Sequence, residues 1–120
     1  MKLMIVDDSN IIRRMIARSI GDYGFDVRTA SDGMEAVQVF EQFRPDLVTM
    51  DITMPRLDGI VCIEQLLKRR PDTKILVISA LADKATAVEA VERGAHGFVL
   101  KPFTEKRIND ELRHVIDGDK

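Results

Sequence analysis

Three aspartates stand at the ends of short apolar segments of the sequence. Asp7 and Asp8 directly follow Leu3–Val6, and Asp51 directly follows Leu47–Met50. A charge is out of place in a strand that is buried on both faces, so each strand is predicted to end at its carboxylate. If the two segments are neighbouring parallel strands, all three carboxylates lie in one crevice at the carboxyl end of the sheet.

A crevice with three carboxylates needs a compensating charge. At an effective dielectric constant of about 20, each close pair costs on the order of a few kcal/mol. Either one carboxyl group keeps its proton with a raised pKa, or a cation binds among the oxygens, and such hard ligands suit Mg²⁺ better than zinc. The alternative is that Asp7 and Asp8 only cap the helix that follows them, because aspartate is a favoured N-cap residue.

Two more polar residues end later apolar segments. Ser79 follows the run ILVI, and Lys101 follows the run FVL and precedes Pro102, a position where a cis peptide bond is accessible. A hydroxyl and an ammonium group facing carboxylates and a cation suit a transferred phosphoryl group. The cation and the lysine would neutralise its oxygens, the serine would donate a hydrogen bond, and one aspartate would attack. Taken singly, Ser79 and Lys101 are typical of surface residues.

The elements that must position these residues alternate along the chain. Apolar runs predict five strands, at Lys2–Val6, Phe25–Ala30, Leu47–Met50, Lys74–Ser79 and Phe98–Leu100. Apolar residues at helical spacing predict a helix after each strand. The second helix is predicted at Gly33–Phe43. The apolar residues of the other four are Ile12, Met15, Ile16 and Ile20 in the first helix, Ile60, Ile63, Leu66 and Leu67 in the third, Ala85, Val88 and Val91 in the fourth, and Ile108, Leu112, Val115 and Ile116 in the fifth.

Helix caps support these boundaries. Asp8, Ser9 and Asn10 offer N-caps for the first helix, Thr104 offers one for the last, and Gly94 offers a C-cap for the fourth. The fold class is therefore α/β, a doubly wound five-stranded parallel sheet of the flavodoxin-like (βα)5 kind. We adopt the common strand order 2-1-3-4-5, which makes the first and third strands neighbours, from known domains of this class.

Length and composition limit the function classes. The 120 residues fit one domain, 1–120, and no stretch approaches the roughly 20 apolar residues of a membrane span. The N-terminus lacks the apolar region of a secretory signal, and the one cysteine, Cys62, forms no internal disulfide, so we expect a cytoplasmic protein. With 18 basic and 20 acidic side chains, we expect no nucleic acid or membrane partner.

Together, these motifs resemble the receiver domain of bacterial two-component response regulators over the whole chain. The matching segments are Asp7-Asp8 after LMIV, Asp51 in MDITMP, Ser79-Ala80 after ILVI, and Lys101-Pro102-Phe103 after FVL. The resemblance implies a phosphorylation-activated signalling switch rather than an enzyme. Asp51 would accept a phosphoryl group from a histidine kinase or histidine phosphotransfer domain.

The resemblance also implies a role for each site residue. Asp8, Asp51, the Thr53 carbonyl and, less directly, Asp7 would hold Mg²⁺. Lys101 would pair with the phosphoryl oxygens, and Ser79 would move toward them. Phe98 would be the switch aromatic, here without the hydroxyl group of a tyrosine, although plain core packing is its alternative. Thr53 and Leu81 would border the path of the hydrolytic water and, lacking amide or carboxylate groups, would slow dephosphorylation.

The resemblance is to single-domain chemotaxis regulators, so the output is expected to be a surface. A downstream target protein would bind one face of the domain. That face consists of the helix with Ala85 and Val88, the strand Phe98–Leu100 and the helix after Thr104. Arg13 and Arg14 on the first helix would lie at the rim of the docking site for the phosphoryl donor, or simply on a solvated helix face.

Three other functions are compatible with parts of this pattern. A Mg²⁺-dependent phosphohydrolase of the haloacid dehalogenase type uses similar chemistry, but it has a second acidic residue where Thr53 stands, and its nucleophile normally follows the first strand. A flavodoxin-like electron carrier shares the topology, but an acidic crevice would repel a flavin phosphate. A receiver that acts as a relay intermediate or a phosphate sink is also an open alternative.

Overall fold

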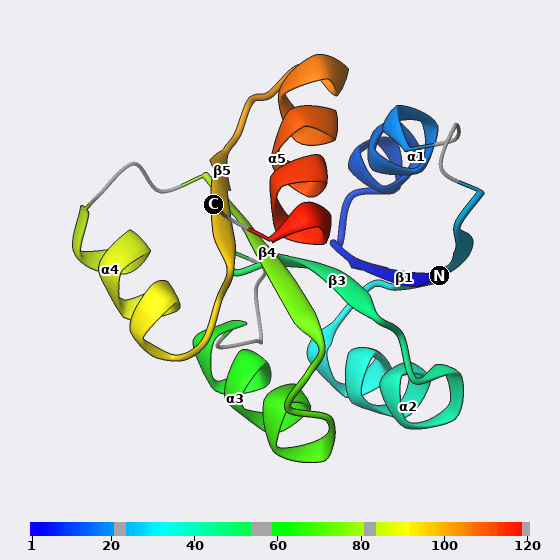
Figure 1. Ribbon diagram of the computed structural model, residues 1–120, viewed down its shortest axis with the longest axis vertical. Coiled ribbons are helices and arrows are strands. Elements are labelled where there is room, and N and C mark those ends of the chain that lie inside the picture. The colour runs from blue at the N-terminus through cyan, green and yellow to red at the C-terminus, as the bar shows by residue number, and fades with distance from the viewer. Residues whose placement is uncertain (21–23, 54–58, 81–83, 119–120) are drawn as a thin grey trace.

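The computed structural model describes residues 1–20, 24–53, 59–80 and 84–118, and strands and helices alternate along it (Figure 1). The strands are β1 (Lys2–Val6), β2 (Asp26–Ala30), β3 (Leu47–Asp51), β4 (Lys74–Ser79) and β5 (Gly97–Leu100). The helices are α1 (Asn10–Ser19), α2 (Gly33–Phe43), α3 (Gly59–Arg69), α4 (Lys84–Glu92) and α5 (Glu105–Asp117).

The sheet has the order β2-β1-β3-β4-β5 and is parallel throughout, which confirms the predicted fold class and strand order. Val6 is in register with Met50, so the next residues along, Asp7 and Asp51, end neighbouring strands. β3 continues one residue beyond the prediction because Asp51 pairs with Ile78 of β4. The charged residue is therefore the last residue of the strand and not the first residue after it.

Two apolar layers enclose the sheet, because successive strand side chains point to opposite faces. Met4, Val48 and Val77 pack on one side with α2 and α3, whereas Leu3 and Leu76 pack on the other side with α1 and α5. Figure 1 shows these two helix pairs on opposite sides of the strands. The central strands are buried on both faces, so their carboxyl ends are held in fixed positions for a site.

Side-chain caps set where the helices begin. Ser9 is the N-cap of α1 and accepts a hydrogen bond from the Ile12 N–H, and Thr104 caps α5 in the same way. Asp32 caps α2 through the Glu35 N–H. Because Ser9 caps α1, the alternative that Asp8 serves as the cap is wrong.

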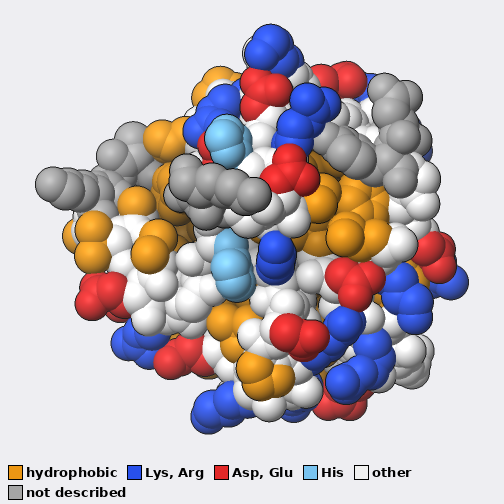
Figure 2. Space-filling model, viewed as in Figure 1, with side chains coloured by type: hydrophobic (Ala, Val, Ile, Leu, Met, Phe, Trp, Pro, Cys, Tyr) orange, Lys and Arg blue, Asp and Glu red, His pale blue; other side chains and the backbone are white. Residues whose placement is uncertain are grey.

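Helix α4 does not pack as its pattern predicted. Ala85, Val88 and Val91 face solvent, with Val88 46% and Val91 55% exposed, and Ala90 is the buried residue instead. Figure 2 shows apolar side chains gathered on the surface over α4, at the left of the view. The prediction was wrong because a short alanine-rich helix has too weak a stripe to identify its buried side.

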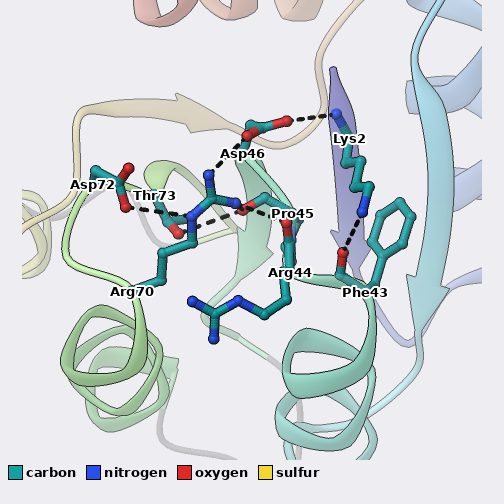
Figure 3. Close-up of polar contacts among 8 residues, drawn as sticks. All are labelled: Lys2, Phe43, Arg44, Pro45, Asp46, Arg70, Asp72 and Thr73. Carbon is teal, nitrogen blue, oxygen red and sulfur yellow. Dashed lines mark hydrogen bonds and ion pairs between the residues drawn. The ribbon is translucent and has the colours of Figure 1, made fainter.

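The amino end of the sheet is held together by Arg70, just after α3 (Figure 3). Its guanidinium group donates to the carbonyls of Arg44 and Pro45 at 2.7 and 2.8 Å. It also forms ion pairs with Asp46 and Asp72 at 3.0 and 3.3 Å. This single side chain therefore joins the end of α3 to the loop that leads into β3.

Within the described residues, no helix has the length and apolar character needed to span a membrane.

Candidate functional site

The strand ends bring the three predicted carboxylates together. Asp7, Asp8 and Asp51 each offer an oxygen, and these oxygens lie within 4.8 Å of one another. Asp7 is 0% and Asp51 1% exposed, whereas Asp8 is open to solvent. Two buried carboxylates beside an accessible one form a pocket of hard oxygen ligands with one open side.

Both oxygens of Asp51 have hydrogen-bond donors. Oδ1 accepts from the Thr53 N–H at 2.8 Å and from the Thr53 hydroxyl at 2.6 Å, and Oδ2 accepts from Lys101 Nζ at 3.0 Å. The Ile52 N–H donates to the Ile78 carbonyl at 3.0 Å, which ties the segment after Asp51 to β4. The carboxylate at the end of β3 is thus fixed in one orientation.

Lys101 is the cation that this structure places among the carboxylates. Its Nζ lies 3.0 Å from Oδ2 of both Asp51 and Asp7, and only the contact with Asp51 has the geometry of a hydrogen bond. Burial lowers the pKa of Lys101, but its contacts with Asp51 and Asp7 outweigh that effect and the pKa is raised. Lys101 is therefore charged in this site at neutral pH.

Asp7 is the most enclosed of the acidic side chains. Burial raises its pKa, the Ser9 N–H and Lys101 lower it, and the Asp51 charge raises it again, with a net upward shift. Its Oδ1 accepts from the Ser9 N–H at 2.8 Å, whereas its buried Oδ2 has the ion pair with Lys101 but no hydrogen bond within the described part of the chain. One lysine does not neutralise three carboxylates, so this donor set fits a small divalent cation such as Mg²⁺.

The predicted switch residues Ser79 and Phe98 come from β4 and β5. Ser79 ends β4, is fully buried, and accepts the Lys101 N–H through its carbonyl at 2.8 Å. The Lys101–Pro102 peptide bond is cis. Phe98 is partly buried, packs against the core on the α2 and α3 side, and borders a hollow with Leu100 and Phe103. Leu81 lies outside the described residues.

Arg13 has a closer relation to the site than its position on α1 predicted. It is half-buried, and its guanidinium group donates to the Asp7 carbonyl at 2.5 Å. Arg14 is exposed, as expected of a solvated helix face. The sequence gives no signal for this contact, because it depends on the turn between β1 and α1.

The sequence and structure both match known proteins. The sequence model of the family described as "Response regulator receiver domain" matches residues 3–113. The chemotaxis protein CheY of Thermotoga maritima is 40% identical over 115 residues, which is 95% of this chain and 96% of the relative. The strand order of such chemotaxis proteins is the example from which the predicted order was adopted.

Two solved structures illustrate the structural likeness. Vibrio cholerae chemotaxis protein CheY4 superposes with a TM-score of 0.87 at 30% identity, covering 95% of this chain and 97% of the other. CheY in the CheX-CheY-BeF3-Mg complex from Borrelia burgdorferi superposes with a TM-score of 0.89 at 30% identity, covering 96% of this chain and 88% of the other.

Proposed function

The chain belongs to the response regulator receiver domains, which makes it a signalling switch rather than an enzyme, and we propose that Asp51 is its phosphoacceptor. The observation that carries this proposal is the position of Asp51, held at the end of β3 between Thr53 and Lys101 and beside two more carboxylates. We further propose that residues 1–120 form one receiver domain, which the family match over 3–113 supports.

The proposed reaction is an in-line transfer from a phosphohistidine. A bond forms between phosphorus and an Asp51 carboxylate oxygen while the bond from phosphorus to the donor nitrogen breaks, and that nitrogen keeps the electron pair. Lys101 is close enough to Asp51 to neutralise charge on the phosphoryl oxygens. Hydrolysis reverses the switch when water attacks phosphorus and Asp51 leaves as a carboxylate.

Mg²⁺ is the cofactor that we propose for this transfer. Asp8, Asp51 and the Thr53 carbonyl would hold it, with Asp7 acting less directly, and the buried Asp7 Oδ2 supports a cation in this pocket. When bound, Mg²⁺ would offset the negative charge of the carboxylates and of the incoming phosphoryl group. Thr53 and Leu81 are the residues that we propose for control of the hydrolytic water.

The output surface that we propose consists of α4, β5 and α5. Ser79 and Phe98 are the proposed switch residues, and the exposed Val88, Val91 and Leu100 supply an apolar surface for a downstream target protein. We propose a histidine kinase or histidine phosphotransfer domain as the donor and the cytoplasm as the place of the exchange. A motor-directed regulator, a relay intermediate and a phosphate sink all share this mechanism.

The phosphohydrolase alternative is not favoured. Asp51 ends β3 and not the first strand, and Thr53, where that family has its second acidic residue, donates its hydroxyl to Asp51 instead. Turnover also separates the two functions, because a receiver gains at most one phosphoryl group on each chain, whereas a hydrolase continues to consume phosphomonoesters.

Intact mass measurement after incubation with acetyl phosphate and Mg²⁺ tests the proposal. Wild type should gain one phosphoryl group, Asp51→Asn should gain none, and the matched control Asp26→Asn, on the exposed edge of β2, should behave as wild type. Phosphorylation of Asp51→Asn to the wild-type extent would show that another residue is the acceptor.

A further inference from the structure

Asp8 is the exposed member of the acidic cluster, and Arg13 forms hydrogen bonds with the two residues that flank it in the sequence. The Arg13 guanidinium group donates to the carbonyl of Asp7 at 2.5 Å. The backbone N–H of Arg13 donates to the carbonyl of Ser9 at 3.0 Å. The Arg13 side chain therefore holds the residue before Asp8, and its backbone N–H forms the first helical hydrogen bond to the residue after Asp8.

The backbone is what positions Asp8, because its carboxylate forms no hydrogen bond or ion pair with the described residues of the chain. Asp7, in contrast, is fixed by its N–H, which donates to the Ala30 carbonyl at 3.1 Å, and by its Oδ1, which accepts from the Ser9 N–H. The Asp7 carbonyl belongs to the planar peptide group that joins Asp7 to Asp8. A donor that fixes this oxygen also fixes the plane from which the Asp8 side chain departs.

We propose that Arg13 is a positioning residue of the metal site, which holds the Asp8 carboxylate where a divalent cation meets it together with Asp51. This inference rests on the proposed function and adds to it a residue that contacts neither the cation nor the phosphoryl group. Mutation of a residue that orients the ligands of a metal typically lowers metal affinity by roughly 10- to 100-fold.

Geometry and charge predict opposite effects of removing Arg13. The Arg13 guanidinium group is a positive charge hydrogen-bonded to the residue before Asp8, so it repels an incoming cation, and the loss of its charge alone would strengthen Mg²⁺ binding. The loss of its hydrogen bond to the Asp7 carbonyl would instead release the Asp7–Asp8 peptide group and weaken binding. The direction of the change therefore identifies the role.

Arg14 provides a matched control at the next position of the same helix. It is exposed, and its guanidinium group has no hydrogen bond or ion pair within the described part of the chain. Arg14→Met removes the same charge from the adjacent position of the helix without removing a contact to the turn between β1 and α1. Weaker binding by Arg13→Met than by Arg14→Met therefore reports the contact, because loss of the charge would change the affinity in the opposite direction.

An NMR titration with Mg²⁺ tests the inference. Arg13→Met should bind Mg²⁺ about tenfold more weakly than wild type, whereas Arg14→Met should bind it equally or slightly more tightly. The amide nitrogen of Asp8 lies in the peptide group that Arg13 binds, so its chemical shift without metal should change in Arg13→Met and stay unchanged in Arg14→Met. Binding by Arg13→Met that is equal to or tighter than binding by Arg14→Met, or an unchanged Asp8 shift in Arg13→Met, would overturn the inference.

Arg13→Lys and Arg14→Lys keep the test decisive if Arg13→Met does not unfold cooperatively. Lysine retains the charge but has a single donor group on a more flexible chain, so Arg13→Lys should bind Mg²⁺ more weakly than Arg14→Lys. Equal affinities in this pair would also overturn the inference. If wild type itself bound no Mg²⁺, the proposed function would fail as well, whereas normal wild-type binding with no effect at Arg13 contradicts the positioning role alone.

Discussion

Thr49 is a fully buried polar residue in the middle of β3, and its hydroxyl has no hydrogen-bond partner among the described residues. Its strand neighbours Ile5 and Leu76 belong to the apolar layer beneath α1 and α5. Thr49→Val should therefore raise the free energy of unfolding by about 1 kcal/mol, because burial of an unpaired hydroxyl is unfavourable. Urea unfolding monitored by circular dichroism measures this change.

Thr73 is the matched control, because it is equally buried and its hydroxyl donates to the Pro45 carbonyl at 3.4 Å. Thr73→Val leaves that carbonyl with one donor fewer, so it should lower the stability. If both substitutions changed stability in the same direction, hydrogen bonding would not explain the effect at Thr49.

His96 gives the stability of the fold a predictable pH dependence. Its Nδ1 accepts from the Ile75 N–H at 3.1 Å, and partial desolvation of the otherwise exposed ring together with the nearby Lys74 charge lowers its pKa below the ordinary value of 6.5. Folding thus favours the neutral ring. Its stabilising contribution is complete above pH 6.5 and is lost as the pH falls from there through the folded-state pKa.

Urea unfolding at about pH 7.5 and about pH 5.5 checks this dependence. The free energy of unfolding of wild type should decrease on acidification. This decrease should be smaller in His96→Gln and as large as in wild type in His114→Gln. The two residues are the only histidines of the chain, and both line one hollow with Lys74 and Glu111. Figure 2 shows their side chains on the surface of one face. A decrease that persisted unchanged in His96→Gln would contradict the assignment.

At the scale of elements, Arg70 joins α3 to the loop before β3. Arg70→Met removes two hydrogen bonds to carbonyls and two ion pairs from a side chain that is only 24% exposed. We expect the free energy of unfolding to fall by about 2 kcal/mol, mainly through the carbonyls left with fewer donors. Thermal or urea unfolding measures the loss.

Arg44 offers a control for the change of charge. Its backbone carbonyl accepts from Arg70, but its own guanidinium group makes no ion pair or hydrogen bond with the described residues (Figure 3). Arg44→Met should therefore change stability by less than about 0.5 kcal/mol. An equal loss in both variants would mean that charge, and not the contacts of Arg70, determines the effect.

The elements that the sequence identified best are those with a strong apolar pattern. The runs of β1 and β4 and the Thr104 cap of α5 gave boundaries that the structure confirms, because burial on both faces and a side-chain cap act locally. Helix α4 was misjudged because contact with the sheet, and not its own weak stripe, selects Ala90 as the buried residue.

The candidate site was predictable to the extent that it depends on strand ends. A strand order was enough to bring Asp7, Asp8 and Asp51 together, since parallel strands place their carboxyl ends at one edge. The contact of Arg13 with the Asp7 carbonyl was not predictable, because it follows from the path of one turn. The roles of Ser79, Phe98 and Leu81 in switching and dephosphorylation stay predictions.

At the scale of the whole molecule, the two ends of the sheet differ in chemistry. The carboxyl end holds the acidic cluster and Lys101, whereas the amino end holds the Arg70 contacts and His96. Substitutions at the amino end should therefore change stability without changing which residue is phosphorylated. This separation lets the stability tests and the test of the phosphoacceptor be interpreted independently.

Localisation of the phosphoryl group tests the central claim most directly. After reaction with acetyl phosphate and Mg²⁺, borohydride reduces an aspartyl phosphate to homoserine, and peptide mass mapping identifies the converted position. The account predicts homoserine at Asp51 alone, in an amount that matches the phosphorylated fraction found by intact mass. Conversion at Asp7, Asp8 or an aspartate outside the cluster, with Asp51 unchanged, would contradict it.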